Sequence, residues 1–229
     1  MTSPDQVAPP LRVVELRRYL LCPRRADDFV ELFDRALVES QERHGLRVLG
    51  QFVELPGREH FVWLRGFPDM AARLAGLTAF YDGPVWREHR DEANAMMIDS
   101  DDVLLLRPIL AQGLLNGVPG SGSLTVTVYP LPEPAEDGFL GFFHERVEPA
   151  LAEQGSSLVG LLVTEPSANT FPRLPVREGE HVLVRVSRSA LDDVPTGPRW
   201  RAAEAELGRW TLGPAAVLRL EPTPRSRLR

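Results

Sequence analysis

The stretch from Trp86 to Met97 is predicted to form a helix with one face suited to chemistry. Residues on that face follow three- and four-residue spacing, and they are Trp86, His89, Arg90, Ala93, Asn94 and Met97. Histidine is the natural acid or base near neutral pH, and arginine can hold a carboxylate, enolate or phenolate oxygen. We therefore predict His89 and Arg90 as catalytic residues, and Trp86, Asn94 and Met97 as ligand-binding residues. The alternative is that the polar residues lie at the edge of the face, as solvated or interface contacts.

A second candidate lies on the first predicted strand, where Glu15, Arg17 and Tyr19 alternate with apolar residues. If Val14 and Leu16 face the helices, the three polar residues face the interior between two sheets. We predict all three as ligand-binding residues. The alternative is that Glu15 and Arg17 form a structural ion pair, since buried pairs often specify packing and not chemistry.

Two histidines are a weaker candidate. His60 and His181 follow matching Glu residues in the two halves of the chain, so they are expected to approach each other. Two histidines without a third ligand are a poor basis for a metal site. Haem, with His89 as axial ligand, also stays an open alternative. We expect no cofactor and no metal.

The apolar pattern predicts the same order of elements twice. In the first half, strands are expected at 11–19, 47–54, 60–65 and 103–107, and helices at 23–44, 68–79 and 84–97. In the second half, strands are expected at 124–129, 158–164, 181–186 and 216–220, and helices at 138–154 and 200–209. This is an α+β fold of two β-α-β-β-α-β units of the ferredoxin-like kind.

Matching residues indicate that the two units are copies. Residues 48–56 align with 158–166 at an offset of 110, Glu59-His60 aligns with Glu180-His181 at 121, and 83–87 aligns with 197–201 at 114. We predict a first repeat at 11–108, a Gly-rich linker at 109–123 and a degenerate second repeat at 124–222. Each sheet has helices on one face only, so the other faces are expected to pack together as a barrel within one chain. A monomer is therefore expected.

The composition excludes several classes of function. All 26 basic residues are arginine, so Schiff-base, pyridoxal phosphate and P-loop lysine chemistry are excluded. The net charge of −6 argues against a nucleic-acid partner. No apolar run of about 20 residues predicts a membrane span. The single cysteine, Cys22, cannot form an internal disulfide. Without a recognisable signal peptide, we expect a cytoplasmic protein.

Several segments resemble the NIPSNAP family, part of the dimeric α/β barrel superfamily. Residues 15–19 resemble its Glu-x-Arg-x-Tyr opening, 61–67 its third strand, 79–86 the segment entering its last helix, and 99–108 its fourth strand. The second half departs from this pattern, because Thr125 and Thr127 stand where Glu15 and Arg17 are expected.

The resemblance implies the fold and where a site would lie. Related barrels, namely cofactor-free monooxygenases and haem-degrading enzymes, place sites between helices and sheet, and Trp63 and His89 resemble part of that set. We therefore expect the first half to bind a small apolar or aromatic molecule. Proton transfer, cyclisation or cofactor-free oxygenation is the expected chemistry. The alternative is a non-catalytic interaction or scaffold protein, because a fold alone does not specify a function.

Overall fold

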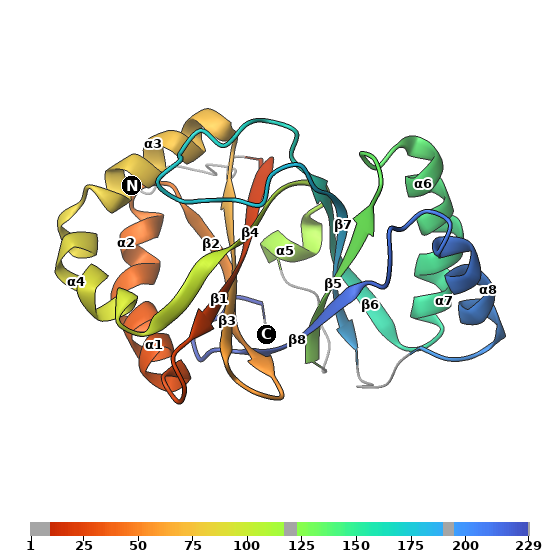
Figure 1. Cartoon of the computed structure of the whole chain (residues 1–229), viewed down its shortest axis with the longest axis horizontal. Coiled ribbons are helices and arrows are strands. Elements are labelled where there is room, and N and C mark those ends of the chain that lie inside the picture. Colours follow the sequence, from red (N-terminus) through yellow and green to blue (C-terminus); the bar gives the residue numbers. More distant parts are fainter. Residues whose placement is uncertain (1–9, 117–122, 190–194, 229) are drawn as a thin grey trace, which may run out of the picture.

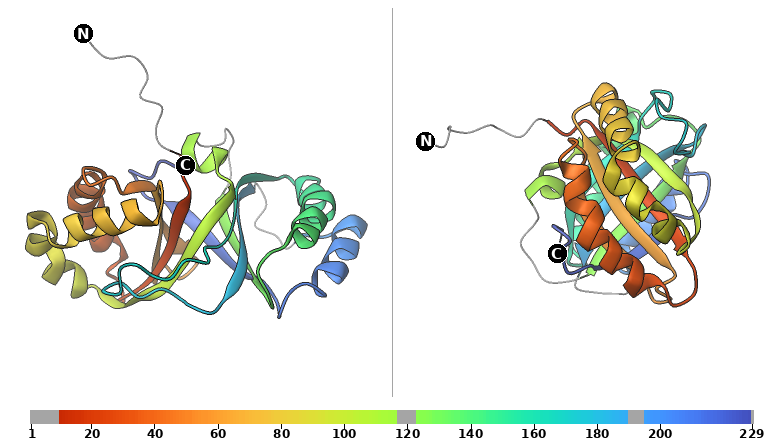
Figure 2. Two further views of the ribbon diagram at one scale, coloured as in Figure 1. Left: turned by 90° about the horizontal axis from the view of Figure 1, so that it is seen from above. Right: turned by 90° about the vertical axis from the view of Figure 1, so that its left-hand side faces the viewer.

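Antiparallel strands close into one barrel, and helices pack against it at both ends of the molecule (Figure 1, Figure 2). The computed structural model describes residues 10–116, 123–189 and 195–228. The first half contains β1 (Val13–Leu21), α1 (Ala26–Leu32), η1 (Phe33–Leu37), α2 (Val38–Glu42), β2 (Arg47–Leu55), β3 (His60–Phe67), α3 (Met70–Tyr81), α4 (Pro84–Asn94) and β4 (Met97–Leu110). The second half contains β5 (Ser123–Leu131), α6 (Asp137–Phe142), η2 (Phe143–Val147), α7 (Glu148–Ala152), β6 (Ser156–Thr164), β7 (His181–Ser189), α8 (Pro198–Leu207) and β8 (Ala216–Pro222).

The strand order around the barrel is β1-β3-β2-β8-β5-β7-β6-β4. Each half therefore supplies four adjacent strands, and the halves join along two seams. In one seam Phe52 of β2 faces Pro222 of β8. In the other Leu162 of β6 faces Pro108 of β4. Closure pairs the edge strands of both halves, so the barrel needs no second chain to cover its sheets.

The barrel interior is apolar, and this decides which way β1 faces. Val14 and Leu16 pack inside the barrel with residues such as Val126 and Leu220 from the second half. The expectation that Val14 and Leu16 face the helices was therefore wrong. Two sheets packed face to face leave few polar partners in the interior, so apolar side chains fill it. The alternate residues of β1 point towards the helices instead.

The two halves share backbone landmarks. The first long helix of each half contains a π-helical segment, η1 and η2, with starts 110 residues apart. Gly45 and Gly155, which end these helices, both have φ of +78°, a conformation that favours glycine. The register of β2 shifts between residues 48 and 50, and that of β6 between 158 and 160.

The third strands follow a different offset from the one expected. Trp63 of β3 pairs with Arg17, and Arg185 of β7 pairs with Thr127. The offset is therefore 122, not 121, and Val182 takes the place matched to His60. The adjacent Glu-His pairs were a misleading guide, because strand register depends on which face each residue occupies.

Two segments differ from the expected boundaries. β4 begins at Met97, well before residue 103, because its acidic first residues still pair with the end of β1. Residues 112–116 of the expected linker form a short helix, α5 (Gln112–Asn116), and residues 117–122 lie outside the described residues. Leu114 of α5 packs tightly against Gly160, as Leu228 near the C-terminus packs against Gly50.

A long segment of the second half, residues 165–180, crosses onto the first half. Figure 1 shows it as the teal loop that runs past β4 to α3. Its backbone bonds β4 at both ends, with Glu165 N donating to Leu105 O at 2.9 Å and Arg177 N donating to Val103 O at 2.8 Å. Phe171, midway, is buried in the core between the first sheet and its helices. This segment therefore covers part of the first half's helical layer.

Among the described residues, no helix is both long and apolar enough to cross a membrane.

Candidate functional site

The helix-facing side of the first sheet holds one carboxylate surrounded by three arginines. Arg17 Nη1 donates to Glu15 Oε2 at 3.0 Å, Arg65 Nε donates to the same oxygen at 3.0 Å, and Arg73 Nε donates to Oε1 at 2.7 Å. All four side chains are 0% exposed. We call Glu15, Arg17, Arg65 and Arg73 the arginine cluster.

The fold brings the cluster together from three elements. Glu15 and Arg17 alternate on β1, and Arg65 faces Glu15 from β3 in the strand register. Arg73 comes from the first turn of α3, which Asp69 caps by accepting a hydrogen bond from Ala72 N at 2.7 Å. The cap fixes where α3 begins, and thereby places Arg73 over the sheet.

Polar neighbours hold the outer edges of the guanidinium groups. Arg17 Nε donates to Tyr19 Oη at 2.7 Å, and Arg65 Nη1 donates to Gln41 Oε1 of α2 at 2.9 Å. Arg73 Nη1 donates to Asn169 Oδ1 at 3.0 Å. Asn169 belongs to the segment 165–180, so the second half supplies a hydrogen-bond acceptor to this first-half cluster.

The cluster carries more positive charge than its surroundings balance. Three guanidinium groups contact the single carboxylate of Glu15, which leaves an excess of two positive charges. Arg17 Nη2, Arg73 Nη2 and Trp63 Nε1 are buried and find no hydrogen-bond partner among the described residues. Buried charges and donors without partners cost several kcal/mol, so such an arrangement is rare in a purely structural core.

The ionisation of the cluster follows from its charges. Burial alone would raise the pKa of Glu15, but Arg65, Arg17 and Arg73 together hold it well below its usual range. Burial lowers the pKa of the Arg73 guanidinium, against the opposing effect of Glu15. Burial also raises the pKa of Tyr19, which Arg17 only partly offsets. Glu15 is thus an anion and Tyr19 a neutral phenol near neutral pH.

Aromatic side chains surround the cluster. The Trp63 ring lies 4.9 Å from the Arg65 guanidinium carbon and 6.1 Å from the Tyr19 ring. Tyr81, at the end of α3, packs against Phe171 of the segment 165–180 at 5.9 Å between ring centres. Tyr81 is half-buried and close enough to Arg17 to influence its pKa. Tyr81 and Phe171 therefore form the outer edge of the cluster's surroundings.

The predicted helix face is placed apart from the cluster. Arg90 and Asn94 on α4 are exposed, and Arg90 Nε bonds Asp91 at 3.2 Å. His89 is 18% exposed at its side chain, with Nδ1 3.7 Å from Glu92 Oε2. The helix buries Ala93 as its inward residue, so the polar residues lie at the margin of its packed side. Their functional roles stay predictions.

The apolar members of that face also separate. Trp86 is half-buried and stacks edge-on against Tyr81 at 4.9 Å. Met97 is not on the helix, because α4 ends at Asn94 and Met97 begins β4. The structure thus brings together Glu15, Arg17, Tyr19 and Trp63 and leaves His89, Arg90 and Asn94 at the surface of α4.

Two cluster residues, Arg65 and Arg73, and two of their polar neighbours, Gln41 and Asn169, were not predicted from the sequence. Arg73 carried a usable signal, because it stands among apolar residues in a predicted helix. Arg65 was recognisable only once the pairing of β1 with β3 was known. Asn169 lies in an insertion whose path the sequence does not encode locally.

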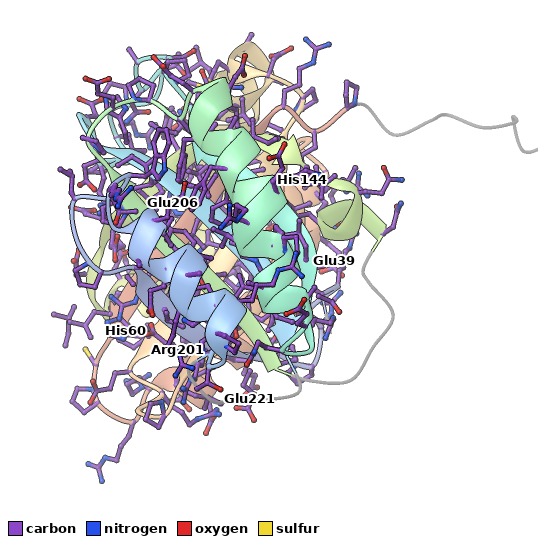
Figure 3. The ribbon with its side chains drawn as sticks, turned by 90° about the vertical axis from the view of Figure 1, so that its right-hand side faces the viewer. Glu39, His60, His144, Arg201, Glu206 and Glu221 are labelled. Atoms are coloured by element: carbon purple, nitrogen blue, oxygen red, sulfur yellow. The ribbon has the colours of Figure 1, made fainter. Side chains whose placement is uncertain are left out.

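The second half has a plainer arrangement in the matching place. Thr125, Thr127 and Ser187 occupy the register positions of Glu15, Arg17 and Arg65. A single pair remains, in which Arg185 Nε donates to Glu148 Oε1 at 2.7 Å and Nη2 donates to Oε2 at 3.1 Å. That pair balances its own charge. Figure 3 shows the outer side of this half, where His144, Arg201 and Glu206 lie on the helices away from the barrel.

The structure places the two histidines on different strands, His60 on β3 and His181 on β7. His60 Nδ1 lies 3.3 Å from Arg18 Nη2 and 3.6 Å from Glu54 Oε2, in a network on β1 and β2. His181 begins β7, and β3 and β7 are not neighbours in the barrel. Among the described residues, no group of three or more histidine, cysteine, aspartate or glutamate side chains could hold a metal ion.

Two surface pockets are lined by other residues. One of about 280 Å³ lies near Leu11, Phe67 and Arg227. Another of about 740 Å³ lies between η1 and the segment after β8, near Asp34 and Thr223. Neither includes the arginine cluster or the α4 residues.

Comparison with known proteins agrees with this architecture. A candidate monooxygenase from Fusobacterium nucleatum subsp. nucleatum superposes with a TM-score of 0.60 at 10% identity, covering 96% of this chain and 98% of its own. A candidate monooxygenase from Lactobacillus acidophilus gives 0.54 at 12% identity, covering 93% and 95%. A candidate chlorite dismutase gives 0.51 at 11% identity, with the same coverage. At such identities the likeness shows the fold alone.

No curated protein sequence matches this chain. Residues 14–111, however, match the NIPSNAP family model. That range begins on β1 and ends just after β4, so it contains every first-half residue of the arginine cluster. The NIPSNAP match thus covers the first half of this chain, which we call the NIPSNAP half.

Proposed function

We propose that the NIPSNAP half binds a small aromatic or apolar molecule between its sheet and α3, beside the arginine cluster. The second half serves as the scaffold that closes the barrel and covers the site. The single observation that carries this proposal is the asymmetry between the halves. The first half buries Glu15, Arg17 and Arg65 at the register positions where the second half has Thr125, Thr127 and Ser187. The buried donors of the second half without a partner, Arg188 Nε and Trp200 Nε1, lie at other positions, on β7 and α8.

The asymmetry matters because the two halves have the same architecture. We propose that they arose by duplication of one β-α-β-β-α-β unit. The landmarks at an offset of 110, from the π-helical turns to Gly45 and Gly155, support this. So do the mirrored seams, since Phe52–Pro222 and Leu162–Pro108 are the same contact made twice. If one unit gave both halves, a costly cluster retained in only one of them indicates selection for a task.

The chemistry that fits this site is proton transfer at a bound molecule, including cyclisation or cofactor-free oxygenation. Tyr19 is the titratable group beside the unpartnered donors, and its raised pKa keeps it a proton donor. His89 is better placed for proton exchange with solvent, because its side chain is 18% exposed at the surface of α4, beside Glu92. Tyr19 is therefore the first residue to test for a proton-transfer role.

The alternative is a non-catalytic interaction or scaffold protein. Its support is the complete burial of the cluster, which a purely structural charge network would share. The excess charge argues against this alternative, because a network that only specifies packing has no use for unbalanced arginines.

Ligand binding can be tested without knowing the ligand. The purified protein would be analysed by native and denaturing mass spectrometry for a co-purified compound, and by thermal shift against a panel of small aromatic molecules. We expect at least one compound to raise Tm in wild type and in Trp210→Phe, which alters the second half. The same shift should be lost in Trp63→Leu.

The location of the site can be tested with a further pair. His89→Ala should keep the thermal shift if the ligand lies at the cluster, and lose it if the ligand lies on α4. The absence of any co-purified compound together with the absence of any thermal shift would favour the scaffold alternative.

A further inference from the structure

We propose that the ligand carries an anionic oxygen group, such as a carboxylate, and that Arg17 and Arg73 bind this group inside the arginine cluster. This inference rests on the proposed function, that the NIPSNAP half binds a small molecule. It adds the chemical class of the ligand and the residues that select it.

The first step of the argument is charge. Glu15 is the only carboxylate bonded to the three arginines among the described residues, and every cluster side chain is fully buried. Water cannot screen the two positive charges in excess. An anion bound there would supply the missing negative charge. Arginine side chains commonly bind carboxylates and phosphates in this way.

The second step is the distribution of donors. Arg65 is fully used, with Nε and Nη2 on Glu15 and Nη1 on Gln41. Arg17 and Arg73 each keep one buried Nη2 with no partner in the described structure. Both guanidinium groups are bonded to Glu15, Arg17 at Oε2 and Arg73 at Oε1, so the two groups with an unpartnered nitrogen meet at the same carboxylate. Glu15 and Arg65 therefore bond only to protein groups, whereas Arg17 and Arg73 each keep a donor that could bind a ligand.

The third step is the surroundings. Trp63 Nε1 is another buried donor without a partner, and its ring lies against Arg17 and Arg65. Tyr81 and Phe171 provide aromatic surface at the outer edge. An aromatic acid fits this combination, with its oxygens on the arginines and its ring among the aromatic side chains.

The fourth step concerns the second half. Asn169 Oδ1 accepts from Arg73 Nη1 at 3.0 Å, while Asn169 Nδ2 donates to Leu174 O at 2.9 Å. Asn169 thereby holds Arg73 Nη1, while Arg73 Nη2 has no partner among the described residues. We assign Asn169 as a positioning residue for the anion.

Benzoate and benzamide provide the test, because they have nearly the same shape and differ in charge. Binding of each would be measured by isothermal titration calorimetry to wild type, Arg17→Gln, Arg73→Gln and the second-half control Arg185→Gln. We expect wild type and Arg185→Gln to bind benzoate in preference to benzamide. Arg17→Gln and Arg73→Gln should each weaken benzoate binding by about tenfold or more and leave benzamide unchanged.

The outcomes separate this inference from the proposed function. Equal binding of benzoate and benzamide, unchanged in Arg17→Gln and Arg73→Gln, would overturn the anion subsite and keep the proposed function. A co-purified neutral compound with no benzoate binding would do the same. No binding of either probe and no co-purified compound would overturn both. If the arginine variants fail to fold, the preference of wild type for benzoate or benzamide decides.

Discussion

The two halves of the barrel solve the same packing problem with different chemistry. Each places long helices with a π-helical turn over four strands, and each buries a tyrosine at the same register, Tyr19 and Tyr129. Beside Tyr129 lies one balanced pair, Arg185 with Glu148. Beside Tyr19 lie three arginines on one carboxylate. The fold itself thus needs no charge cluster, and the cluster in the first half calls for a functional explanation.

The largest expected effect comes from Glu15, which holds all three arginines. Glu15→Gln should destabilise the protein by about 3–5 kcal/mol, because it leaves buried guanidinium groups without a countercharge. Urea unfolding would measure the loss, with Thr125→Val as the matched change in the second half and an expected effect below about 1 kcal/mol. A Glu15→Gln protein as stable as wild type would mean that the arginines are solvated or paired in another way.

The two helix-starting tryptophans should respond unequally to truncation. Trp200 is buried in the second core, whereas Trp86 is only half-buried against α3. Trp200→Ala should cost about 3–5 kcal/mol, and Trp86→Ala about half of that, because less apolar area is lost. Paired thermal melts would check the order. Equal costs would show that the two helices are anchored alike despite their different exposure.

The balanced pair in the second half should be replaceable as a unit. Glu148→Leu alone leaves Arg185 buried without its partner and should cost about 3 kcal/mol. Glu148→Leu combined with Arg185→Leu should recover most of that loss, because both charges are then gone. A double variant no more stable than Glu148→Leu would indicate that Arg185 has a further role, for example through Ser156, to which its Nη1 donates at 2.9 Å.

The smallest effect concerns pH. Burial raises the pKa of Tyr129 to about 12 from 10.0. A raised pKa means that the folded state retains a proton which the unfolded state loses, so this contribution is full below pH 10 and is lost as pH rises towards 12. Tyr129→Phe should weaken the alkaline fall in stability between these values. Denaturant titrations at several pH values would measure it. An unchanged slope would assign the alkaline fall to other groups.

Much of the fold was predictable because local patterns carry it. The order of strands and helices, and closure into one barrel by one chain, follow from apolar periodicity and from the need to cover each sheet. The facing of β1 was not predictable, since both of its faces are buried and neither reads as the solvent side. The short helix α5 was hidden in a Gly-rich stretch whose composition suggests a linker.

The site was predictable only in its local part. Glu15, Arg17 and Tyr19 lie two residues apart on one strand, so their common face was visible. Their meeting with Arg65 and Arg73 depends on strand register and helix docking, which are long-range. The α4 residues were predicted as site residues because helical spacing is visible in the sequence. The exposed fraction of a side chain, by contrast, depends on what packs nearby.

The segment 165–180 has a consequence for how such a barrel can change. In a barrel made of two identical chains, one gene encodes both sides, so an extended loop on one side appears on the other. Here the loop that reaches across the seam has only a short counterpart, the turn between β2 and β3. Each side of a single-chain barrel can therefore vary alone, and one side can become a dedicated cover for its neighbour without burdening its own surface.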